Sequence, residues 1–265
     1  MVKIGKREFN IQAVLFDKGH YLSAWNILRY CRRPAAFLWR YLTGKGSYPY
    51  QVRIATPTGQ IAPQVDSYYD AITVNEIFFR LDYKAGPDDR VVVDIGANIG
   101  LSALYFLSRN RESKVYLYEP VKDNIVKLRH NLRDFSDRII VREEAVYFEG
   151  GKKKFGTDRY GRYGGLNRAS NKYIEVNCIP INDVLSSVIG QEGIIDILKI
   201  DIEGDEIAVV NAIDPKYFGK IKKIYFEIDY TAAIAPHFSV RPEYFKEERR
   251  GSIFVMAGKK IADNR

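Results

Sequence analysis

The stretch RVVVDIGANIG, Arg90–Gly100, decides the fold. Its first half, VVVDI, is a nearly continuous apolar run, which is typical of a central parallel strand buried on both faces. Gly96 and Gly100 follow in a loop whose backbone can turn sharply and lie against a ligand, because no Cβ intervenes. Asn98 stands where the dinucleotide-binding loop G-x-G-x-x-G has its second glycine, so this loop is related to that fingerprint but differs from it.

Strand-like and helix-like segments alternate from this stretch onward. The expected strands, in chain order, are VVVDIG, KVYLYEP, RIIVREEAV, IIDILKID, IKKIYFEID and, as the one strand after Tyr230, SIFVMAG. Helical spacing of apolar residues between the second and third strands is shown by Ile125, Leu128, Leu132 and Phe135. The Gly-rich and basic interval between RIIVREEAV and IIDILKID is expected to be irregular. The alternation predicts an α/β fold with a doubly wound, mostly parallel sheet.

The first 69 residues differ from the rest and predict a basic, aromatic-rich extension of helices and a β-hairpin, followed by the main domain at 70–265. A helix is expected up to Arg33, with Leu22, Trp25 and Leu28 on one side, and Pro34 opens a second helix. Aromatic residues beside arginines suit a peripheral contact of residues 20–42 with an anionic membrane surface. The alternative is that the apolar stripe packs on the main domain or on a second subunit of a homo-oligomer.

Charge and hydropathy limit where the protein is expected to be located and which partners it is expected to have. Residues 1–50 hold nine Lys/Arg and two acids, and residues 152–172 hold seven Lys/Arg and one acid, which predicts anionic partners near both segments. No apolar run reaches ~18 residues and no signal-peptide core is present, so the expected location is cytoplasmic, or peripheral at the membrane if residues 20–42 bind lipid.

Ligands of doubly wound sheets bind at the carboxyl ends of the strands, and acids gather there. The candidate residues at these strand ends are Asp94, the loop Gly96, Ala97, Asn98 and Gly100, Glu119, Glu144, Asp201, Glu203, and 227–229. An acid-lined rim repels a pyrophosphate and suits a ligand with an amine, ribose hydroxyls and a cationic centre, such as S-adenosyl-L-methionine. Glu119 is expected to accept the ribose hydroxyls and Glu144 the adenine amine. The alternative is that such acids are solvated or cap helices.

The segments VVVDIGANIG, YLYEP and DILKIDIEGDEIAVVNAI together resemble the FkbM family of S-adenosylmethionine-dependent methyltransferases. The resemblance covers residues 70–230 and implies a Rossmann-like class I methyltransferase fold for 70–265. It also implies that Asp94 to Gly100 form the methionine-side loop, that Glu119 holds the ribose, and that Asp201 and Glu203 lie beside the reactive methyl. Two departures are Asn182, where the family usually has an acid, and the short tail after Tyr230.

The resemblance implies O-methylation of a hydroxyl group, often on a sugar of a glycan, glycolipid or secondary metabolite. The acceptor is then a small molecule or glycan, with an anionic or lipid-linked one left open. Direct displacement needs a base for one proton, and Asp201 is the first candidate, with His237 second. No metal-ligand spacing is visible.

Two further functions stay open. The basic, aromatic segment Lys152–Lys172, with Tyr160 and Tyr163 among arginines, allows RNA methylation. The other alternative is a non-catalytic module that binds S-adenosylmethionine. The absence of an Asn-Pro-Pro-Tyr-type loop after the fourth strand argues against methylation of base amino groups.

Overall fold

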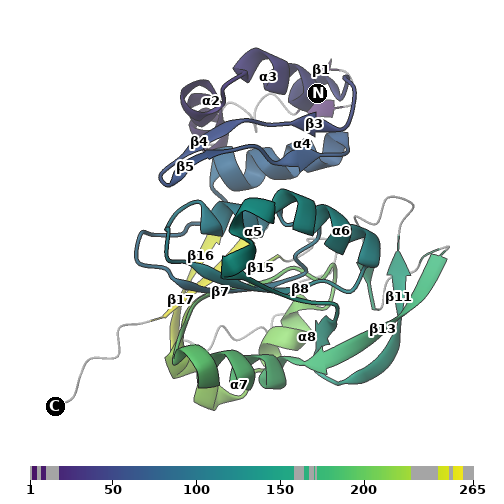
Figure 1. The fold of residues 1–265 in the computed structure, drawn as a ribbon, viewed down its shortest axis with the longest axis vertical. Coiled ribbons are helices and arrows are strands. Elements are labelled where there is room, and N and C mark those ends of the chain that lie inside the picture. Colours follow the sequence, from purple (N-terminus) through teal and green to yellow (C-terminus); the bar gives the residue numbers. More distant parts are fainter. Residues whose placement is uncertain are drawn as a thin grey trace.

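A computed structural model of the chain describes residues 2–4, 7–9, 18–157, 164–166, 170, 172–227, 244–250 and 253–258 (Figure 1). Its centre is a seven-stranded sheet in the order β16-β17-β15-β14-β7-β8-β9. These strands are β7 (Val91–Ile95), β8 (Lys114–Tyr118), β9 (Ile139–Arg142), β14 (Ile195–Ile200), β15 (Ile221–Glu227), β16 (Phe245–Arg250) and β17 (Ile253–Gly258). The five strands from β15 to β9 are parallel, and β17 and β16 join antiparallel.

Helices cover both faces of this sheet, as the alternation predicts, so the doubly wound α/β fold is confirmed (Figure 1). The helical segments of the main domain are α5 (Leu101–Leu107), α6 (Lys122–Asn131), η2 (Arg133–Arg138), α7 (Ile181–Glu192), α8 (Glu206–Asn211) and η3 (Pro215–Lys220). One core lies on the side of α5 and α6, and a second lies under α7, α8 and η3. All five residues of β7 are buried, because its side chains feed both cores.

The expected boundaries need three corrections. RIIVREEAV is not one strand, because the chain leaves the central sheet after β9 and β10 (Ala145–Tyr147) joins another sheet. That second sheet, in the order β10-β13-β11-β12, makes the segment after Gly150 regular, with β11 (Gly151–Thr157), β12 (Gly164–Gly165) and β13 (Lys172–Pro180). The tail holds two strands rather than one, since β16 pairs with β17 along the sheet edge.

The N-terminal part adds helices and short hairpins beside the face covered by α5 and α6 (Figure 1). Its elements are β1 (Val2–Ile4), β2 (Arg7–Phe9), α2 (Lys18–Tyr30), α3 (Pro34–Thr43), β3 (Tyr50–Gln51), β4 (Ile54–Thr56), β5 (Gly59–Ile61), β6 (Gln64–Val65), α4 (Tyr68–Val74) and the π-helical η1 (Asn75–Arg80). Pro34 opens α3 as predicted. No helix in the described part of the chain is long and apolar enough to cross a bilayer.

The apolar stripe of α2 does not pack on the main domain, so that half of the alternative is wrong, whereas its packing on a second subunit stays a prediction. Leu22, Trp25 and Leu28 are 39%, 62% and 65% exposed. The buried side of α2 instead carries Ser23 and Asn26, which donate hydrogen bonds to Asn75 Oδ1 (2.6 Å) and to the Phe79 carbonyl (2.7 Å). Because these bonds satisfy the polar groups, the helix can bury its polar side.

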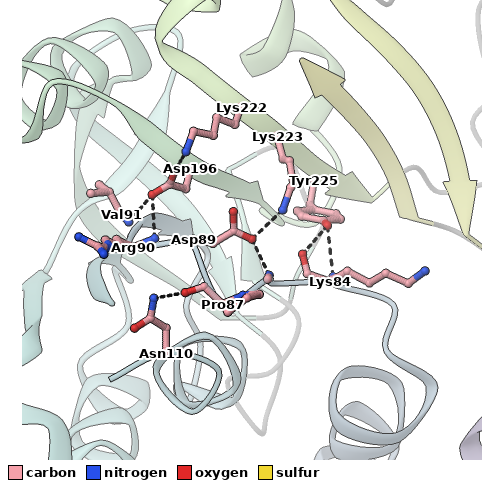
Figure 2. A network of polar contacts seen from close by, with 11 residues as sticks. Lys84, Pro87, Asp89, Arg90, Val91, Asn110, Asp196, Lys222, Lys223 and Tyr225 are labelled. Atoms are coloured by element: carbon pink, nitrogen blue, oxygen red, sulfur yellow. Dashed lines mark hydrogen bonds and ion pairs between the residues drawn. The ribbon is translucent and has the colours of Figure 1, made fainter. Parts of the chain in front are cut away.

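A polar network ties together the amino ends of the central strands (Figure 2). Asp196 accepts hydrogen bonds from the backbone N–H groups of Arg90 (2.7 Å) and Val91 (2.8 Å) and pairs with Lys222 at 2.5 Å. Asp89 pairs with Lys223 at 2.6 Å. These contacts hold the amino ends of β7, β14 and β15 together, at the opposite end of these strands from the candidate site.

Candidate functional site

A cavity of about 800 Å³ lies at the carboxyl ends of β7, β8 and β14. Its volume falls in the range of small-molecule and cofactor pockets. Much of its lining comes from residues 95–99 at the end of β7, residues 118–121 at the end of β8, 145–147 in β10, 201–206 after β14, and the N-terminal helices α4 and η1. The position is the one at which doubly wound sheets bind their ligands.

The loop after β7 passes very close to the end of β14, and only glycine fits there. Gly96 has φ +75°, and a Cβ at this residue would lie 1.7 Å from the Asp201 carbonyl oxygen. The backbone N–H groups of Gly96 and Ala97 both donate to the Tyr118 carbonyl, at 3.0 and 3.1 Å. These contacts hold the loop against two neighbouring strands, so that Ala97 and Asn98 face the cavity.

Glu119 joins this loop to the end of β8. Its carboxylate accepts hydrogen bonds from the Asn98 N–H (2.8 Å), the Val121 N–H (2.9 Å) and Asn124 Nδ2 (3.2 Å). Burial raises the pKa of Glu119, although these three donors oppose the effect. Since a carboxylate has about four acceptor positions, the contacts leave about one for a ligand hydroxyl.

Lys199 is the charged residue at the floor of the cavity that sequence reasoning missed as a site residue. Its ammonium lies 3.0 Å from Asp94 Oδ1 and 3.2 Å from Asp201 Oδ2, and only 2% of the residue is exposed. Burial alone would lower the pKa of Lys199, but the two carboxylates outweigh it and hold that pKa above its ordinary value. A lysine inside the apolar run IDILKI was the available signal, because buried lysines require partners.

The turn after β14 is held by the carboxylate of Glu206. Glu203 adopts φ +62°, an unusual value for a residue with a side chain, and Gly204 follows at φ +134°. Glu206 holds this turn by accepting hydrogen bonds from the N–H groups of Ile202 (2.9 Å) and Gly204 (3.0 Å). Burial raises the pKa of Glu206. As a result Asp201 and Glu203 both line the cavity.

The cavity therefore brings together seven of the predicted site residues, namely Gly96, Ala97, Asn98, Glu119, Asp201, Glu203 and Glu227. Asp94 is fully buried beneath it, bonded to Lys199 and to Ser102 Oγ (2.5 Å), and does not line it. Gly100 does not line it either, and instead lets the loop approach Leu128 and Leu132.

One predicted residue stands apart from the cavity, and another cannot be placed. Glu144 is absent from the lining, because the chain turns away from the central sheet between β9 and β10. Burial raises the pKa of Tyr118 to about 12, and the charge of Glu144 adds a smaller increase. His237 lies outside the described residues, as do Tyr160, Tyr163 and the arginines around them.

The N-terminal helices α4 and η1 form one wall of the cavity, which the sequence analysis did not predict. Arg80 pairs with Asp82 and lies 3.7 Å from Glu76, and all three line the cavity. Tyr83 lies under Lys199, with the ammonium 5.8 Å from its ring centre. Burial, together with the charges of Asp201 and Glu227, raises the pKa of Tyr83 well above its ordinary value.

The lining is acidic. Among the described residues it contains two cations, Arg80 and Lys199, and nine acids: Asp70, Glu76, Asp82, Glu119, Asp201, Glu203, Asp205, Glu206 and Glu227. Both cations are paired with carboxylates. Such a lining favours a ligand that carries positive charge and hydroxyl groups. Within the described part of the chain no group of three or more His, Cys, Asp or Glu side chains is arranged to hold a metal ion.

Comparison with known proteins identifies the family. Residues 94–250, more than half of the chain, match the family model of the methyltransferase FkbM domain. The AMB antimetabolite synthetase AmbE of Pseudomonas aeruginosa is 28% identical over 202 residues, which cover 62% of this chain and 10% of that protein. The chain thus spans only a tenth of the length of AmbE.

Two further proteins are similar to this chain. Methyltransferase sdnD of Sordaria araneosa is 22% identical over 187 residues, covering 57% of this chain and 70% of that protein. Among solved structures, the methyltransferase FkbM of Methylobacillus flagellatus is similar, with 18% identity, a TM-score of 0.45, and coverage of 94% of this chain and 60% of that one.

Proposed function

Since the chain belongs to the FkbM methyltransferase family, we propose that it transfers the methyl group of S-adenosylmethionine to a hydroxyl group of a sugar or a small metabolite. One observation carries the proposal: the acidic cavity at the carboxyl ends of the strands places Glu119, Asp201 and the Gly96 loop around one space. The AmbE relative is named an antimetabolite synthetase, which supports a metabolite as acceptor alongside a glycan.

The residues around the cavity fit S-adenosylmethionine. The volume of about 800 Å³ is enough for a nucleoside-sized ligand, and the close approach of Gly96 to the Asp201 carbonyl holds the loop at the rim of this space. Glu119 would accept a hydrogen bond from a ribose hydroxyl, and the segment Ala145–Tyr147 provides a partly apolar wall for a base. When bound, S-adenosylmethionine supplies an electrophilic methyl group on a positively charged sulfur, which the acids of the lining stabilise.

Asp201 is the proposed base. Its side chain is 27% exposed and lines the cavity, and Oδ2 is fixed by Lys199. The other carboxylate oxygen would accept the hydrogen bond of the acceptor hydroxyl and take its proton as the new bond forms. Lys199 is in turn fixed by Asp94, so the base is oriented by a chain of two ion pairs on adjacent strands.

Transfer of label from S-adenosylmethionine labelled in its methyl group to cell extract tests this proposal. After incubation, the extract is separated into glycan, lipid-linked, small-metabolite, protein and RNA pools. We expect label in a hydroxyl of the glycan, lipid-linked or metabolite pool, and much less of it with Asp201→Asn under the same conditions. Label that enters only RNA would replace this proposal with RNA methylation. Failure to bind S-adenosylmethionine in calorimetry would remove the cofactor assignment.

A further inference from the structure

Helices α2 and α3 combine exposed large apolar side chains with a stretch of sequence that contains cations and no acid. Leu22, Trp25 and Leu28 on α2 and Trp39 on α3 are between 39% and 65% exposed. Residues 18–45 contain six Lys/Arg and no acid. We call this surface the N-terminal face, defined by these four apolar residues and the exposed cations Arg29, Arg32 and Arg33.

The charge of this face selects its occupant. A second copy of the chain would bring the same cations against each other, because a two-fold interface pairs identical patches. An anionic surface instead complements them, and tryptophans beside arginines are typical of helices that lie at the headgroup level of a bilayer. The 13 residues of α2 and the 10 of α3 are too few to span a bilayer but enough to lie along one.

The packing of α2 supports the same occupant. The helix buries Ser23, Asn26 and Ile27 and turns its bulkier apolar residues outward, the reverse of a helix that only covers a core. Its polar side is satisfied by Asn75 and the Phe79 carbonyl, so the arrangement is held by specific contacts.

We infer that the N-terminal face docks the protein on an anionic lipid bilayer, with Trp25, Leu28 and Trp39 in the interface and Arg29, Arg32 and Arg33 at lipid headgroups. The helix η1 that holds α2 through Asn75 also lines the cavity with Glu76 and Arg80. Because α2 packs directly on η1, a docked bilayer lies about 20 Å, or two helix diameters, from the cavity. The docking does not depend on the proposed reaction.

Intrinsic fluorescence tests this directly, since Trp25 and Trp39 are the only two tryptophans of the chain. Full-length protein is mixed with vesicles of phosphatidylcholine alone, or of phosphatidylcholine with an equal part of phosphatidylserine. With the anionic vesicles we expect co-flotation, a blue-shifted emission and quenching by brominated acyl chains. Each arginine contributes about fivefold to the partition coefficient, so Arg29→Gln, Arg32→Gln and Arg33→Gln together lower it about 100-fold.

Matched variants distinguish binding through the N-terminal face from non-specific adsorption to lipid. Trp25→Ser with Leu28→Ser should abolish flotation while leaving the thermal unfolding midpoint unchanged, because both side chains are exposed. Val126→Ser with Arg129→Gln changes one exposed apolar residue and one exposed cation on α6 and should float like the parent. Three results would overturn the inference: no binding to the anionic vesicles, equal binding by parent and Trp25→Ser/Leu28→Ser proteins, or a dimer in sedimentation that these substitutions dissociate.

Discussion

The two ends of the central sheet carry similar charges arranged for different purposes. At the amino ends, Asp89 and Asp196 pair with Lys223 and Lys222 and cap backbone N–H groups (Figure 2). At the carboxyl ends, Asp201 shares Lys199 with Asp94, and the acids outnumber the cations around a cavity. A balanced network stabilises the fold, whereas an excess of one charge beside empty space creates a binding potential. Substitutions at the two ends should therefore separate activity from stability.

The largest effect is expected on turnover, at the carboxyl end. Asp201→Asn should lower kcat by about 10²–10⁴-fold, because it removes the proposed base while keeping the shape of the side chain. Affinity for S-adenosylmethionine should stay near that of the parent. Steady-state kinetics and calorimetry measure the two quantities. Turnover equal to the parent would exclude Asp201 as the base and direct attention to Glu203 or His237.

Also at the carboxyl ends of the strands, Gly96→Ala should lower the free energy of unfolding by about 4 kcal/mol and abolish cofactor binding. The new Cβ would lie 1.7 Å from the Asp201 carbonyl oxygen, and φ at this residue is +75°. Gly193→Ala is the matched control, since Gly193 has φ +79° with nothing within 4 Å. It should show only the cost of the backbone conformation, about 1 kcal/mol. Urea denaturation measures both, and equal losses would show that the close approach costs nothing.

At the amino end, Asp196→Ala should lower the free energy of unfolding by about 3 kcal/mol at neutral pH, since it leaves two backbone N–H groups, one of them buried, and Lys222 without their partner. Turnover of the folded fraction should not change. Burial opposes ionisation, but Lys222 and the two N–H donors outweigh it and lower the pKa of Asp196.

A lowered pKa fixes the pH dependence of this term. The stability from Asp196 is fully present above the pKa of an unfolded aspartate, about 3.9, and is lost as pH falls through the lower pKa of the folded state. The difference between parent and Asp196→Ala should thus shrink only below about pH 4. A difference that is already small at pH 6 would contradict the assigned pairing.

The sequence predicted the sheet better than its edges. Apolar runs such as VVVDI and IDILKI need burial on both faces, so they specify central strands regardless of context. FKEERR, which forms β16, has no apolar pattern, and its strand depends on pairing with β17 at an outer edge. The sequence could not predict which side of α2 is buried for a related reason. The hydrogen bonds of Ser23 and Asn26 join residues far apart in the sequence, and helical periodicity does not encode them.

For the candidate site too, local sequence pattern predicted some residues, and long-range contacts determined the others. Glu119, Asp201 and Glu203 could be placed because they directly follow strands that the sequence identifies. Glu144 was placed by the same rule, but the chain leaves the central sheet after Arg142 and takes this residue away from the cavity lining. Arg80 and Tyr83 reach the cavity only because the N-terminal helices fold back over it, which is a tertiary contact without a local signature.

The smallest effect is expected at Glu119, whose carboxylate is shared between structure and ligand. Glu119→Ala should weaken S-adenosylmethionine binding by about 2 kcal/mol, the value of a hydrogen bond to a charged acceptor. Because burial raises the pKa of Glu119, affinity should fall as pH drops, starting above the ordinary glutamate value of about 4.3. Glu119→Gln keeps the size of the side chain and should show low affinity without this pH dependence. Calorimetry from pH 5 to 8 measures both. If parent and Glu119→Gln show the same affinity over this whole range, Glu119 serves only the loop, through its bonds to Asn98, Val121 and Asn124.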